Sequence, residues 1–275
     1  MKDMHYVLEN FFTHKDYLVP GNQIPGTMFT PLHLIYAVTV LTIIVSSAIY
    51  ISRHQKALKP VLATVWALMV VWEFAIGWFD STQGKVVGFD LLTGLSLYPC
   101  SLYLYTTPFL LWGRGKAKQA AGGYLCTLGL LGAVINLLYP IMRLNDYSCI
   151  SFAGMHTYLF HGAMFFTYLT VILSGYHRYD QFTAWQDLFL PCVPSLLLSI
   201  PANLLNYTIG SDYMYFHGDF PIVAWVFGAT SPILITLVLY AMYILIPALF
   251  YLPAYLSYRR QEKREAMLAL YTADF

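Results

Sequence analysis

Charged residues are scarce in this chain of 275 residues. Asp, Glu, Lys and Arg make up 11% of it, against about a quarter in soluble domains, whereas hydrophobic residues make up 58%. So little charge predicts a protein whose surface faces lipid over most of its area. The formal net charge of +1 argues against a nucleic-acid partner.

Patterned cysteines and a leader are also missing. The four cysteines contain no CxxC pair and no metal-ligand spacing, and three of them (Cys100, Cys126 and Cys192) fall in apolar segments. This argues against a disulfide framework and predicts neither a metal site nor a soluble cofactor. The N-terminus lacks the basic stretch and unbroken apolar run of a cleavable signal.

The first residues instead follow helical spacing. Apolar side chains at i, i+3 and i+4 within residues 1–29 predict a short amphipathic helix on the membrane surface, or a segment that caps the loops; they are Met4, Val7, Leu8, Phe11 and Phe12.

Apolar segments long enough to cross a bilayer dominate the rest of the chain. A span needs roughly 20 apolar residues, and the sequence predicts an all-α membrane bundle of seven transmembrane helices within residues 30–257, followed by a cytoplasmic tail, 258–275. The seven segments are residues 32–51, 60–79, 91–112, 120–141, 152–173, 188–205 and 232–256.

The distribution of basic residues predicts the orientation. With the N-terminus outside and the C-terminus in the cytoplasm, eleven Lys and Arg residues lie on the inner side and four on the outer side. A rise of about 1.5 Å per residue then puts Cys100 on the third segment and His161 on the fifth near mid-depth. Other polar residues fall in the outer half of the membrane: His33, Glu73, Asn136, His156, Asn203 and Asn206. Because ionisable groups inside a membrane usually face a bundle interior or a wet cavity, we expect a cavity that opens outward and reaches Cys100 and His161.

A polar stripe surrounds Cys100 on the third segment. Thr93, Ser96, Cys100, Tyr103 and Thr107 recur every three or four residues, as they would on one face of a helix. Pro99 predicts a kink that exposes the thiol. The alternative is a small, buried, inert cysteine, as most membrane cysteines are.

Two histidines lie close together on the fifth segment. His156 and His161 are about 140° apart around a helix, so they cannot reach the same atom. His161 is a candidate base for Cys100, because a thiol in apolar surroundings needs a group that removes its proton. It could equally be a structural histidine that bonds within the bundle.

Glu73 and the asparagines have less specific readings. Glu73 could orient a histidine, relay protons or anchor helices. Asn136, Asn203 and Asn206 could supply oxyanion donors or hold helices together.

Short motifs in the same order resemble a known family. "PLHL", "LYPCS", "FHG" and "GSDYMYFHGDFP" resemble the YwaF-like bacterial membrane proteins and the eukaryotic transmembrane acyltransferases that remodel ether phospholipids. The resemblance implies acyl transfer between phospholipids through a cysteine thioester, with Cys100 and His161 as the catalytic pair. It also implies the plasma membrane as location in a bacterium and the endoplasmic reticulum in a eukaryote. More distant relatives resemble lipid hydrolases. Ser101 stands where the eukaryotic branch has histidine, which leaves acceptor preference and the choice between transferase and hydrolase open.

We therefore expect a phospholipid acyltransferase with phospholipid and lysophospholipid substrates and no cofactor. Cys100 attacks the acyl ester, His161 is the general base, and Glu73, Tyr103, Asn136 or Asn203 orient groups or stabilise the oxyanion. Three alternatives stay open. One is a lipid hydrolase with the same Cys100 and His161 pair; the others are an ion-coupled transporter that uses Glu73 and a haem protein that uses His33 with His156 or His161. A retinal protein is excluded, because the last segment has no lysine for a Schiff base.

Overall fold

The computed structural model describes residues 2–85, 87–91, 94–178, 182–218, 221–228 and 231–273, and within these ranges it contains helices and no strand. The α-helices are α1 (Lys2–Glu9), α2 (Pro31–Ser52), α3 (Gln55–Gln83), α4 (Leu102–Trp112), α5 (Gly115–Tyr124), α6 (Leu130–Leu138), α7 (Ile141–Leu144), α8 (Phe152–Leu173), α9 (Val193–Ile209), α10 (Pro221–Phe227) and α11 (Pro232–Ala273). Short turns of other helix types are η1 (Lys15–Tyr17), η2 (Gly21–Gln23), η3 (Leu125–Gly129), η5 (Trp185–Cys192) and η6 (Tyr213–Tyr215).

Five helical stretches in the described residues are long and apolar enough to cross a membrane. They are Pro31–Ser52, Gln55–Gln83, Gly115–Leu144, Trp185–Ile209 and Pro232–Leu268. They correspond to five of the seven expected segments and support a multi-pass membrane protein. The fifth expected segment forms α8 over the same residues, 152–173, but it is not among the five.

The third expected segment is not a continuous helix. Only Leu102–Trp112 is helical, and the described residues from Gly94 to Ser101 form bends and turns. The predicted helical stripe through Ser96 and Cys100 is therefore wrong, and there is no helix for Pro99 to kink. Thr93 lies outside the described residues.

Side-chain caps explain where two of the long helices begin. Thr30 Oγ1 accepts a hydrogen bond from the His33 N–H (3.4 Å) at the start of α2, where Pro31 occupies the first turn. Ser151 Oγ does the same for the Gly154 N–H (3.2 Å) at the start of α8. Each cap satisfies one of the amides that a helix start leaves unpaired.

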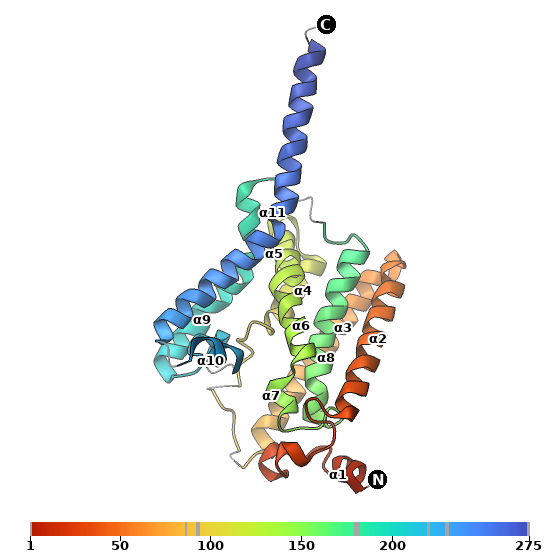
Figure 1. Cartoon of the computed structure of the whole chain (residues 1–275), viewed down its shortest axis with the longest axis vertical. Coiled ribbons are helices and arrows are strands. Elements are labelled where there is room, and N and C mark those ends of the chain that lie inside the picture. The colour runs from red at the N-terminus through yellow and green to blue at the C-terminus, as the bar shows by residue number, and fades with distance from the viewer. Residues whose placement is uncertain are drawn as a thin grey trace.

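Helix α8 is the centre of the larger helix group. It packs against α2, α3 and α6 (Figure 1), and most of its side chains are buried. Several of its polar side chains, Thr157, His161, Thr167 and Thr170, are buried inside the protein and do not face lipid. Helix α11 packs along η5 and then extends beyond the other helices (Figure 1), with residues 256–268 exposed.

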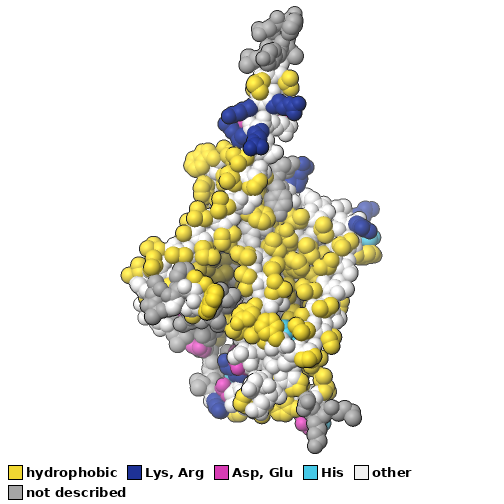
Figure 2. All heavy atoms as spheres, in the orientation of Figure 1, with side chains coloured by type: hydrophobic (Ala, Val, Ile, Leu, Met, Phe, Trp, Pro, Cys, Tyr) yellow, Lys and Arg dark blue, Asp and Glu magenta, His cyan; other side chains and the backbone are white. Residues whose placement is uncertain are grey.

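The surface separates into an apolar middle and charged ends. Figure 2 shows hydrophobic side chains over the middle of one face and most Lys and Arg side chains toward its two ends. The connections α2–α3 and α4–α5 and the end of α8 lie at the end of the bundle from which α11 emerges (Figure 1). These connections, together with the first turns of α3 and α5, carry seven of the eleven basic residues assigned to the inner side.

The N-terminal segment forms a helix and contacts the bundle. Helix α1 covers Lys2–Glu9, and Val7 on it is buried. Further along, the Phe152 N–H donates to the Phe11 carbonyl (3.0 Å), and the Phe12 ring lies 5.2 Å from the Phe152 ring. The segment thus reaches the start of α8.

Candidate functional site

Cys100 lies in the turn that leads into α4, preceded by irregular backbone. Irregular backbone at membrane depth needs partners within the protein, because no water is present to provide them. Tyrosine hydroxyls supply several: Tyr213 donates to the Leu91 carbonyl (2.7 Å) and accepts from the Leu95 N–H (3.1 Å), and Tyr105 donates to the Ser96 carbonyl (3.1 Å). The hydroxyl of Tyr124 donates to the Pro99 carbonyl. These bonds fix the residues on the N-terminal side of the thiol.

A π-helical turn faces the same segment. Residues 125–129 form this turn between α5 and α6, and Tyr124 comes directly before it. Beyond it, Gly132 lies against the thiol: a Cβ added at Gly132 would be 3.6 Å from Cys100 Sγ. π turns inside helices are frequent at functional sites, since they change which side chains face a partner.

Asn136, one turn beyond Gly132, contacts the sulfur. Its Nδ2 donates to Cys100 Sγ at 3.7 Å and to the Gly132 carbonyl at 2.9 Å. Cys100 is half-buried. The structure thus joins two of the residues selected from the sequence and puts an amide donor beside the thiol.

His161 is held in one tautomer. Its Nδ1 lies 2.9 Å from the Thr157 carbonyl, which can only accept, so Nδ1 carries the proton. Nε2 then has the lone pair of a base, and it is buried with no hydrogen-bond partner among the described residues. No hydrogen bond joins His161 Nε2 to Cys100 in the described part of the chain, and the sulfur accepts from Asn136.

Glu73 and His156 form a second polar pair. Glu73 Oε2 lies 3.8 Å from His156 Nε2, and Glu73 Oε1 accepts from Ser96 Oγ at 2.9 Å. Through Ser96 this pair reaches the segment that carries Cys100. Glu73 Oε2 and His156 Nδ1 have no hydrogen-bond partner among the described residues, so the two side chains are neighbours without a hydrogen bond between them.

An ion pair near this cluster was missed from the sequence. Both guanidinium nitrogens of Arg143 bind the Asp80 carboxylate, at 2.9 and 2.6 Å. Opposite charges just beyond the outer ends of the second and fourth expected spans, 60–79 and 120–141, were the available signal.

His33 belongs to another network. Its Nδ1 accepts from the Phe29 N–H (2.8 Å), so Nε2 is protonated and donates to the Tyr158 hydroxyl (2.6 Å). Both nitrogens are occupied, which leaves none for a haem iron. His33 therefore holds the start of α2 to α8.

Asn203 and Asn206 lie apart from the thiol, in bonds of their own. Asn203 Nδ2 donates to the Ser199 carbonyl (3.0 Å) and the Tyr240 hydroxyl (2.6 Å). Asn206 accepts from Ser211 and from the Tyr213 N–H (2.8 Å each) and donates to the Tyr213 carbonyl (2.9 Å). The structure gives both amides a role in joining the end of α9 to its neighbours.

Tyr103 points to α8. Its hydroxyl lies 3.2 Å from Thr167 Oγ1, and the residue is fully buried. No group of three or more His, Cys, Asp or Glu side chains in the described ranges is arranged to hold a metal ion.

An apolar groove runs beside α4. It has a volume of about 330 Å³, and one of its lining residues is Leu102, two positions after Cys100 in the sequence. One wall is the α4 face with Leu102, Tyr105, Thr106 and Phe109; the other walls are Ala117, Ala120 and Ala121 of α5 and Val193, Pro194, Leu197, Leu198 and Pro201 of α9. Its lining is almost entirely apolar, which suits a hydrocarbon chain.

Comparison with known proteins gives a family and no further relative. No curated protein and no solved structure matched the chain. The model of the TMEM164 family matches residues 28–258, which include α2 to α9 and the apolar part of α11. Since this match covers most of the chain, the protein is a multi-pass membrane protein that belongs to the TMEM164 family.

Proposed function

We propose that the protein is a phospholipid acyltransferase that carries the acyl group as a thioester on Cys100. The observation behind this proposal is the thiol itself, half-buried in a lipid-facing bundle with the Asn136 amide at its sulfur. An amide donor beside a nucleophile can stabilise the oxyanion that forms on attack. The motifs around Cys100 and His161, which resemble those of transmembrane acyltransferases, support the same chemistry.

The reaction has two matching halves. The sulfur of Cys100 attacks the ester carbonyl of a phospholipid while His161 Nε2 takes the thiol proton. The tetrahedral intermediate then breaks the bond to the glycerol oxygen, and His161 returns the proton to that oxygen, which releases a lysophospholipid. A second lysophospholipid reverses these steps: its hydroxyl gives its proton to His161 and attacks the thioester, and the sulfur leaves and regains a proton.

The proton transfer requires a rearrangement on substrate binding. In the structure the Cys100 sulfur accepts a hydrogen bond from Asn136 Nδ2. His161 Nε2 has no hydrogen-bond partner among the described residues. Catalytic hydrogen bonds in proteins without substrate are often longer than in the reacting complex. We infer that a bound ester draws the Asn136 amide onto its carbonyl oxygen and so frees the sulfur for His161.

The apolar groove beside α4 is suited to the acyl chain. Its lining includes Leu102, two positions after Cys100 in the sequence, and its three alanines, Ala117, Ala120 and Ala121, leave room for a chain between α4 and α9. An acyl chain in this groove would keep its carboxyl end near the start of α4, where the thiol lies.

A labelling experiment tests the thioester. The purified protein is incubated with a phospholipid that carries a radiolabelled acyl chain, and the protein is then treated with hydroxylamine. We expect hydroxylamine-sensitive label on the native protein and on Cys126→Ala, and none on Cys100→Ala. Cys126 is a matched control, because it is a fully buried thiol in the neighbouring π turn. Equal acyl transfer by Cys100→Ala would contradict the mechanism.

The products distinguish a transferase from a hydrolase. If water reaches the thioester, the same pair releases free fatty acid. We expect added lysophospholipid to receive the label, with little free fatty acid formed. Fatty acid as the main product would assign hydrolysis instead.

An ion-coupled transporter is the alternative favoured by a different observation, the contact between Glu73 and His156. Proton-linked uptake into vesicles that is lost in Glu73→Gln but kept in Cys100→Ala would assign that function.

A further inference from the structure

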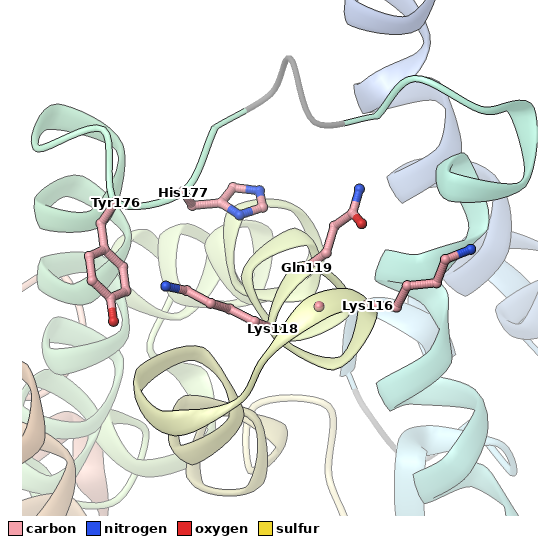
Figure 3. A pocket seen from close by; sticks show the side chains of 6 residues that line it. Lys116, Lys118, Gln119, Tyr176 and His177 are labelled. Carbon is pink, nitrogen blue, oxygen red and sulfur yellow. The ribbon is translucent and has the colours of Figure 1, made fainter.

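A polar pocket lies at the end of the bundle from which α11 emerges, and Cys100 is not among the residues that line it. It has a volume of about 380 Å³ and is formed by the first turns of α5 and by the residues that follow α8. Its walls are Gly115, Lys116, Lys118, Gln119, Tyr176 and His177 (Figure 3). The apolar groove is lined by other residues of α5, namely Ala117, Ala120 and Ala121, so the pocket and the groove lie on opposite faces of this helix.

The Lys118 ammonium is fixed at the wall of this pocket without a counter-charge. Its Nζ lies over the Tyr176 ring, 4.0 Å from the centroid, and Figure 3 shows the side chain reaching between Tyr176 and His177. No carboxylate of the described residues lies within ion-pair distance of it. The ring orients the cation but does not neutralise it, so its charge is available to an anion.

Lys116 supplies a second cation that can move. Its Nζ lies 3.7 Å from Asp187 Oδ1, and its side chain is 72% exposed. The Asp187 side chain is only 10% exposed, but at 3.7 Å no hydrogen bond joins it to the ammonium, so Lys116 can turn to a ligand without breaking one. Asp187 keeps another partner when it does, because its Oδ2 accepts from the Ala184 N–H (3.1 Å).

The other walls are rigid. His177 is buried and lies 2.8 Å from the Tyr251 hydroxyl of α11, and a Cβ at Gly122 would be 2.4 Å from its Nδ1. Behind the lysines, α5 begins at Gly115 with no side-chain cap on its first amides. Open first-turn amides favour an anion in a pocket that already has two cations.

We propose that this pocket binds the phosphate group of an anionic phospholipid, with the phosphomonoester of phosphatidic acid as the simplest example. Two lysine ammoniums and open amides match the charge and the several acceptor oxygens of a phosphomonoester. We assign the phosphate to a lipid because of the pocket's location. The pocket lies at the end of the membrane-spanning helices, between Tyr176 and the basic start of α5. Basic pockets between membrane-spanning helices, near the membrane surface, bind lipid head groups. The site does not depend on the proposed acyl transfer.

Lipid binding to the full chain tests this site. The protein in neutral detergent is titrated with dioleoylphosphatidic acid, with dioleoylphosphatidylcholine as the neutral control, and native mass spectrometry counts the bound lipid. We expect phosphatidic acid to bind more tightly than phosphatidylcholine, and Lys116→Gln/Lys118→Gln to weaken phosphatidic acid about tenfold, because charge-assisted hydrogen bonds are lost. Lys118→Arg keeps the charge and should bind within about twofold of the native protein.

A matched control removes a cation elsewhere. Lys263 is an exposed lysine on the part of α11 beyond the bundle, so Lys263→Gln should leave the affinity unchanged. Unfolding temperatures without lipid verify that all variants are folded. Equal affinity of the double variant and the native protein, or an equal loss in Lys263→Gln, would overturn the proposal.

A soluble competitor identifies the source of the phosphate. Glycerol 3-phosphate that displaces the lipid at similar concentration would support a phosphate site that needs no acyl chains. Failure of glycerol 3-phosphate to compete, together with the loss in the double variant, would support a lipid head-group site. Normal labelling of Cys100 in the double variant is expected, so failure of this site and failure of acyl transfer are distinguishable.

Discussion

Asn136 donates to the sulfur of Cys100 across 3.7 Å and to the Gly132 carbonyl at 2.9 Å. The second bond directs the amide, so that its remaining donor points at the thiol. This arrangement joins α6 to the turn before α4.

Removal of the Asn136 amide should slow acyl transfer with little loss of binding. Asn136→Ala is expected to lower the turnover rate roughly a hundredfold, as loss of one oxyanion donor does, and to leave the Michaelis constant nearly unchanged. Asn203→Ala is the control, because that amide bonds to Ser199 and Tyr240. It should destabilise the protein by about 1 kcal/mol and retain the native turnover rate. Equal turnover in the two variants would contradict a role for Asn136 at the oxyanion.

Replacement of two histidines should separate chemistry from stability. His161→Gln removes the basic Nε2 and should abolish labelling of Cys100, while the protein stays folded. His33→Gln breaks the bonds to Phe29 and Tyr158 and should cost about 1–3 kcal/mol of stability, yet preserve labelling of the folded fraction. Labelling rates and unfolding temperatures measured together check both. Full labelling of His161→Gln would rule out His161 as the base.

The ion pair between Asp80 and Arg143 should contribute measurably to stability. It is bidentate and its side chains are 36% and 24% exposed, so Asp80→Asn should cost about 1–2 kcal/mol. The control is Glu262→Gln, which breaks the more exposed pair with Arg259 on α11 and should cost close to nothing. Denaturant or thermal unfolding in detergent measures both. Equal stability of the two variants would contradict the assignment.

Acid should weaken the junction between His177 and α11. Burial lowers the pKa of His177 from 6.5 to about 4, and the nearby Lys118 ammonium acts in the same direction. The folded protein therefore favours the neutral ring, whereas the unfolded chain protonates it below pH 6.5. The stability that His177 contributes is complete above about pH 6.5 and is lost as the pH falls to about 4. Unfolding temperatures from pH 7.5 downward should fall more steeply for the native protein than for His177→Gln; parallel curves would contradict this.

Much of the helical architecture was predictable from apolar length alone. Helices α2 and α8 match the expected segments 32–51 and 152–173 to within one residue. The segment 91–112 failed, because hydropathy does not distinguish a helix from irregular backbone that is buried within the protein. Its hydrogen bonds come from Tyr213 and Tyr124, far away in the sequence, and no local pattern reveals such partners.

The candidate site was predictable only in part, for the same reason. Depth along the spans grouped Cys100 with His161 and put Asn136, Glu73 and His156 nearer the outer surface, whereas the hydrogen bond at the sulfur comes from Asn136. Depth alone could not show which way a side chain points around its helix. His33 and Asn206 have a similar depth but face partners of their own.

The tyrosine support of the irregular segment has a consequence for the synthesis of the chain. Tyr213 holds the backbone at Leu91 and Leu95, the Met214 N–H donates to the Leu97 carbonyl (3.1 Å), and Tyr243 on α11 donates to the Met214 carbonyl (3.0 Å). The ribosome makes Cys100 early and Tyr243 late. The support of this segment is therefore completed only when the last helix has entered the bundle, and a chain that ended before α11 would lack the Tyr243 bond to the Met214 carbonyl.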